Sequence, residues 1–94
     1  MILLGKEEIE KLADRNQMMD EIEHAYQIIR SGEYYVPNRP TVEHENKTLM
    51  YMPCYTKEAI GTKILTIFPD NAKLGLPSID GVVLLNDQIG RAHV

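Results

Sequence analysis

The chain has 94 residues, of which 44 % are hydrophobic and 26 % charged, and these values argue against a disordered or membrane-embedded protein. Its formal net charge is −4, and its lysines and arginines are scattered, so it offers no basic patch for phosphates and no nucleic acid is expected as a partner. No apolar run approaches the ~20 residues needed to cross a bilayer, and no membrane is expected as a partner either.

The only cysteine and the first residues bear on the cell compartment. Cys54 cannot form an internal disulfide, and the start MILLGKEE passes from four apolar residues directly to charged ones, without the longer apolar stretch of a signal peptide. Both features favour the cytoplasm. A chain of this size buries only about 60 to 65 % of its unfolded surface, so we expect low stability for the segment on its own.

Two helices are predicted in the first third of the chain. Residues 1–4 form an apolar run closed by Gly5, which predicts a short strand, and Ile9, Leu12 and Ala13 then recur at helical spacing.

Asp14 and Gln17 have the spacing of a capping box and predict the start of the second helix. Apolar residues follow at three- and four-residue steps and predict one face packed on a core, and Gly32 is a suitable stop. The apolar positions are Met18, Met19, Ile22, Ala25, Tyr26 and Ile29.

Beyond Gly32 the pattern becomes typical of strands. The tetrapeptide His44-Glu45-Asn46-Lys47 predicts a hairpin turn, and Lys57-Glu58 predicts a second reversal. Because most connections are too short for a crossover helix, the strands should be antiparallel. The predicted class is α+β, with two N-terminal helices packed on a mainly antiparallel sheet whose strands cover residues 39–43, 48–55, 59–68 and 79–85.

Two cations are candidates for a binding role. Lys63 lies within a strand-like run and, by period-two counting, shares a face with Leu65 and Ile67. It is either an outward-facing surface lysine or a functional group, because an unpaired charge among apolar side chains is costly. Arg39 lies between Pro37 and Pro40, which restrict the backbone. It is either a solvated loop residue or a partner for a carboxylate.

Four sequence blocks occur in an order that makes the chain similar to a known family. They are VPNR (36–39), LMYMP (49–53), GTKILTIFPDN (61–71) and GLP (75–77). The chain resembles ornithine cyclodeaminases and mu-crystallins from Met1 to about Asp87. The resemblance implies that this is part of the substrate-binding and dimerisation domain, and that the whole protein is a homodimer.

The resemblance also implies roles for particular residues. Those matching Arg39 and Lys63 contact the substrate carboxylate, and Met52 matches a residue that lines the substrate pocket, although a methionine on a strand also suits plain core packing. Members that act on ornithine have a carboxylate near the position of Met50, so ornithine is not the expected substrate here.

The family's cofactor, NAD(H) or NADP(H), binds to a Rossmann domain C-terminal to this region. None of the six glycines forms a GxGxxG turn. We therefore expect no catalytic or cofactor-binding residue within this segment, and no activity from it alone. Nor do we expect a metal site, since adjacent residues in Glu43-His44-Glu45 point to opposite faces of a strand. His24 is interpreted as a solvated side chain, and Cys54 as an inert packed thiol.

The resemblance stops near the C-terminus. The last six residues, IGRAHV, are what ATC GGA AGA GCA CAC GTC encodes, a string that reads as a sequencing-library adapter. We therefore expect residues 1–88 to be a partial substrate-binding and dimerisation domain and residues 89–94 a non-native tail.

Three functions remain open at this stage. The first is an enzyme that moves hydride between a nicotinamide and a small amino, imino or keto acid, as a cyclodeaminase, an alanine dehydrogenase or an imine reductase. The second is a mu-crystallin-like protein that binds a small ligand or cofactor without relevant catalysis. The third is an autonomous α+β adaptor module. Only the first two predict a dinucleotide turn downstream of this segment.

Overall fold

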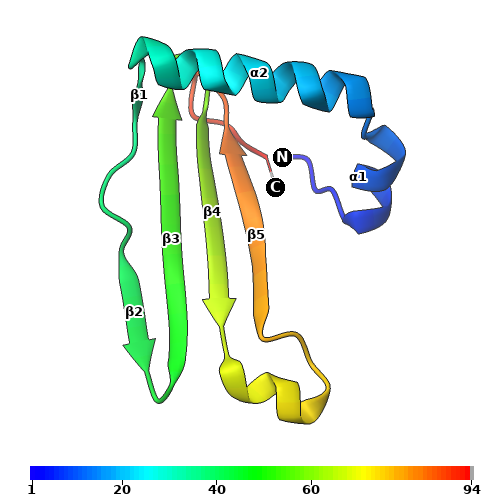
Figure 1. Cartoon of the computed structure of the whole chain (residues 1–94), viewed down its shortest axis with the longest axis vertical. Coiled ribbons are helices and arrows are strands. Elements are labelled where there is room, and N and C mark those ends of the chain that lie inside the picture. Colours follow the sequence, from blue (N-terminus) through cyan, green and yellow to red (C-terminus); the bar gives the residue numbers. More distant parts are fainter. Residues whose placement is uncertain (94) are drawn as a thin grey trace.

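The computed structural model describes residues 1–93, which form two helices and an antiparallel sheet (Figure 1). The α+β class predicted from the sequence is confirmed. The elements are α1 (Lys6–Leu12), α2 (Arg15–Ser31), β1 (Tyr34–Tyr35), β2 (Thr41–His44), β3 (Lys47–Thr56), β4 (Ile60–Ile67), a 3₁₀ helix (Pro69–Leu74), β5 (Ile79–Asn86) and β6 (Ala92–His93). The strand order is β1-β3-β4-β5-β6, and β2 also pairs with β3.

Side-chain and glycine caps set the ends of α2. The Asp14 carboxylate accepts hydrogen bonds from the backbone N–H groups of Asn16 at 2.9 Å and Gln17 at 3.1 Å, which satisfies two donors that a helix start leaves without partners. The helix ends at Gly32, whose φ of 75° is easy for glycine. Both ends agree with the sequence prediction.

The prediction of a strand at residues 1–4 was wrong. These residues have no regular structure, and none of the strand pairings in residues 1–93 includes them. An extended apolar run becomes a strand only where a neighbour completes its hydrogen bonds.

Two tight turns set the register of the central strands. Glu45 (φ 49°) and Asn46 (φ 61°) both have positive φ between the paired residues His44 and Lys47, which suits the twist of a two-residue hairpin. The reversal predicted at Lys57-Glu58 also occurs, since the Thr56 N–H donates to the Ala59 carbonyl at 3.0 Å. Strands β2, β3 and β4 therefore follow one another in space as in sequence.

The outer edge of β3 is interrupted. β1 pairs Tyr35 with Tyr55, while β2 pairs Thr41 with Met50, so the connecting segment holds one residue more than the stretch of β3 that it passes. The Tyr51 N–H donates towards this edge, to the Pro40 carbonyl. Because alternate residues of a strand donate to the same side, Pro53 would also donate there. Its missing N–H thus costs no ladder hydrogen bond.

Few side chains are buried. Leu65 in β4, 9 % exposed, is the one buried hydrophobic residue in the part of the chain described. Helix α2 runs across the end of the sheet at which β3 leads into β4 (Figure 1). The apolar stripe of α2 was predicted to pack on a core. Within residues 1–93 it stays exposed instead, for example Ile22 at 55 %. No helix in this range is long and apolar enough to span a membrane.

Candidate functional site

The candidate residues Met52 and Lys63 are direct neighbours across the sheet. Met52 in β3 pairs with Lys63 in β4, and Lys63 pairs with Val83 in β5. Directly paired residues of antiparallel strands project to the same face. Pairs along the ladders place Met50, Leu65 and Gly81 on this face too, and we call it the Lys63 face.

Arg39 precedes β2 at the interrupted edge. The hydrogen bond from the Tyr51 N–H to the Pro40 carbonyl, 3.1 Å long, continues the β2–β3 ladder one residue before Thr41. Arg39 comes just before this hydrogen-bonded residue and is outside the paired residues of β2. If the same register were continued by one residue, Arg39 would lie opposite Met52.

The two cations are available for a ligand. Both side chains are exposed, and within residues 1–93 neither forms an ion pair. An open groove of about 290 Å³ adjoins Lys63, and its lining includes Leu65 and Val83. Met52 is half-buried. Two unpaired positive groups therefore flank an apolar strip, an arrangement that suits a small anion with an apolar part.

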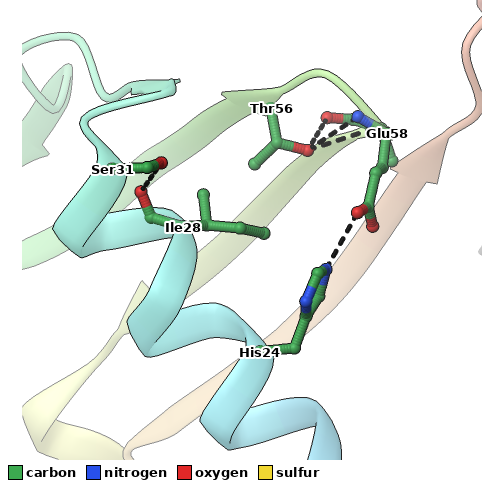
Figure 2. Close-up of polar contacts among 6 residues, drawn as sticks. His24, Ile28, Ser31, Thr56 and Glu58 are labelled. Atoms are coloured by element: carbon green, nitrogen blue, oxygen red, sulfur yellow. Dashed lines mark hydrogen bonds and ion pairs between the residues drawn. The ribbon is translucent and has the colours of Figure 1, made fainter.

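A polar contact missed by the sequence analysis joins α2 to the sheet. His24 Nε2 lies 2.8 Å from Glu58 Oε1, and Figure 2 shows the imidazole of α2 directed at the carboxylate in the turn after β3. The hydrogen bond to Glu58 and the charge of its carboxylate raise the pKa of His24. Interpreting His24 as simply solvated was therefore incomplete. The partners are 34 residues apart, and no local pattern reports such a contact.

Two kinds of arrangement are missing from residues 1–93, a metal-type cluster and a parallel β-α-β unit. In residues 1–93 no three His, Cys, Asp or Glu side chains gather in a way that could hold a metal ion. All strand pairings there are antiparallel, so there is no strand–turn–helix–strand unit of the kind that cradles a pyrophosphate.

Comparison with known proteins identifies relatives over most of the chain. The Delta(1)-pyrroline-2-carboxylate reductase of Bacillus cereus is 30 % identical over 91 residues, which are 93 % of this chain and 28 % of that protein. The structure of Thermococcus litoralis Delta(1)-pyrroline-2-carboxylate reductase in complex with NADH and L-proline superposes with a TM-score of 0.84 at 35 % identity, over 98 % of this chain and 30 % of that one.

An archaeal alanine dehydrogenase dimer with bound NAD is also similar in structure, with a TM-score of 0.80 and 28 % identity, over 93 % of this chain and 27 % of that one. The chain thus spans less than a third of the length of these relatives. The model of the ornithine cyclodeaminase/mu-crystallin family matches residues 1–90, and the chain belongs to this family.

Proposed function

We propose that this segment supplies the substrate-carboxylate site of an NAD(P)-dependent oxidoreductase acting on a small amino or imino acid. The observation that carries the proposal is the pairing of Met52 with Lys63 on one face of the sheet, with Arg39 two residues before Thr41, whose partner Met50 lies on the same face. The relatives with the same fold are a pyrroline-carboxylate reductase and an alanine dehydrogenase, whose named substrates are small carboxylic acids.

In this proposal Arg39 and Lys63 hold one carboxylate between them. Adjacent strands are about 4.8 Å apart, so the backbones of Arg39 and Lys63 are separated by roughly two spacings, or about 10 Å. Both side chains are long and can converge over Met52. The guanidinium would donate two hydrogen bonds in a plane and the ammonium a third, and bonds between charged groups are the stronger ones.

The surroundings of the two cations favour a substrate with an apolar remainder. Met50 and Met52 lie on the Lys63 face from β3, and Val83 lies on it from β5. No acidic residue pairs directly with these three positions, although Glu43 lies farther along the same face, where it pairs with Thr48. The apolar side chains beside Lys63 support a small aliphatic or cyclic amino or imino acid as the substrate.

The other parts of the reaction are assigned to residues outside this segment. The nicotinamide would accept or donate the hydride when bound there, while Arg39 and Lys63 fix the substrate by its carboxylate. The exposed apolar side chains on the sheet and on α2, among them Ile22 and Val82, support burial by the rest of the protein and by a second copy in a homodimer. We further propose that the protein works in the cytoplasm.

Substrate binding by the whole protein tests this proposal. Each lost charge-assisted hydrogen bond contributes about 1.5 to 3 kcal/mol, so Lys63→Met should weaken binding of L-proline or L-alanine about 10- to 150-fold per lost contact. Lys63→Arg should restore only part of the affinity, because a planar fork replaces a compact ammonium. Isothermal titration in the presence of cofactor measures both.

The matched control is Lys73→Met, which makes the same chemical change at an exposed lysine of the 3₁₀ helix and should leave affinity unchanged. Equal affinities for the Lys63→Met variant and the unmodified protein would disprove the carboxylate site. Tight binding without turnover would instead favour the mu-crystallin-like function.

A further inference from the structure

A polar contact connects α2 with the sheet. No residue of α2 is buried, and most of its large apolar side chains are more than half exposed, such as Met19 at 62 % and Ile29 at 54 %, whereas Ile28 is half-buried. Between α2 and the sheet, the one side-chain hydrogen bond within residues 1–93 joins His24 to Glu58. A contact that includes a titratable histidine therefore adds to the half-buried Ile28 in holding α2 over the sheet end.

The turn that carries Glu58 is itself well ordered by hydrogen bonds. The Thr56 hydroxyl donates to the Ala59 carbonyl at 3.1 Å and accepts from the N–H groups of Glu58 and Ala59, both at 3.2 Å. Figure 2 shows this cluster next to the His24 contact. The Glu58 carboxylate is thus presented from a braced turn rather than from a free loop.

We propose that the contact between His24 and Glu58 is a pH-dependent clasp that holds α2 against the end of the sheet where β3 turns into β4. The clasp acts on the two strands that carry Met52 and Lys63. It stands independently of the proposed function, because it requires no ligand.

The charges around His24 determine the direction in which its pKa changes. Glu58 faces it from the turn, and Glu21 adds negative charge from its own helix, and both raise the pKa of His24. Lys57, the other charged residue of the turn, pairs with Glu33 at 3.0 Å. At the neighbouring turn after β5, Arg91 pairs with Asp87 at 2.6 Å. Within residues 1–93, the ion pair of Glu58 is the one with His24.

The raised pKa of His24 determines whether the contact becomes stronger or weaker as the pH rises. In the unfolded chain His24 titrates near its ordinary pKa of 6.5, and below that value the histidine is charged in both states and the clasp contributes fully. As the pH rises through the raised folded-state pKa, the proton leaves and the contribution is lost. The contact therefore stabilises the position of α2 more on the acid side than on the alkaline side.

Hydrogen exchange of α2 in the whole protein tests the clasp. Backbone amides of Arg15–Ser31 are measured by mass spectrometry across about pH 5 to 8, the range in which histidine changes charge, after correction for the intrinsic exchange rate. The unmodified protein should lose protection of α2 as the pH rises. Glu58→Gln should remove this pH dependence, and NMR of ring-labelled histidine should show the pKa of His24 falling towards 6.5.

Two further variants test whether the positive charge of His24 is responsible. His24→Lys keeps a cation at every pH tested, so protection of α2 should persist on the alkaline side. His44→Gln is the matched control, because His44 ends β2, 3.7 Å from Glu45, at the β2–β3 hairpin, which lies at the opposite end of the sheet from α2 (Figure 1). It should leave the exchange of α2 unchanged. The clasp is refuted if Glu58→Gln alters neither the pKa of His24 nor the exchange of α2, or if His24→Lys loses protection as the unmodified protein does.

Discussion

Replacing Gly81 with alanine should loosen the contact between β4 and β5. Gly81 pairs with Leu65, the most buried side chain. A Cβ at position 81 would lie 2.8 Å from the carbonyl oxygen of Ile64, 3.0 Å from Cβ of Leu65 and 3.3 Å from its Cα. The first of these atoms belongs to the backbone, so a side-chain rotation cannot relieve the clash and the two strands must separate locally.

A second glycine, Gly61, allows the free-energy cost of the clash at position 81 to be measured separately. Overpacking of this kind costs about 1 to 3 kcal/mol, while replacing any strand glycine by alanine returns about 0.5 to 1 kcal/mol of chain entropy. Gly61 lies on the same face in β4, and a Cβ there has nothing within 4 Å. The entropy gain is common to both substitutions, so the difference between the two variants should equal the overpacking cost of about 1 to 3 kcal/mol.

Urea unfolding of the whole protein, followed by circular dichroism, measures this difference. Gly81→Ala should unfold at lower urea than the unmodified protein, and Gly61→Ala at the same or higher urea, with unchanged slopes. If Gly81→Ala proves as stable as Gly61→Ala, β5 does not approach β4 as closely as described, and the β4–β5 register that places Val83 beside Lys63 comes into question.

Three other substitutions have defined outcomes. Asp14→Ala should cost about 0.5 to 2 kcal/mol by removing the N-cap of α2, whereas Asp20→Ala within the helix should change little, as thermal melting can show. Asn46→Val should cost about 1 to 2 kcal/mol because its φ is positive, and Asn46→Gly should be neutral or stabilising; a stable valine variant would contradict the turn geometry. In a double-mutant cycle, the change in binding free energy when Arg39 and Lys63 are both replaced should differ from the sum of the changes for the single variants. Strict additivity would mean that the two side chains do not share a ligand.

Local sequence rules predicted much of this fold because their causes act within a few residues. An aspartate before an apolar helical repeat, a glycine after it and an Asn-containing polar turn set the ends of α2 and the β2–β3 hairpin through hydrogen bonds and φ preferences that need no distant partner. The prediction at residues 1–4 was wrong because a strand depends on a neighbour, which the local pattern does not report.

The arrangement of the candidate residues was decided by the tertiary structure. Arg39, Met52 and Lys63 were each noticed in the sequence, but only the pairing registers make Met52 and Lys63 direct neighbours and place Arg39 next to the strand that pairs with Met50. A shift of one residue in either register would have turned Met52 or Lys63 to the opposite face. The contact between His24 and Glu58 likewise exists only because α2 crosses the end of the sheet. Sequence alone therefore determined the elements and the candidate groups, whereas strand register and helix placement decided which of them meet, because both depend on partners far apart along the chain.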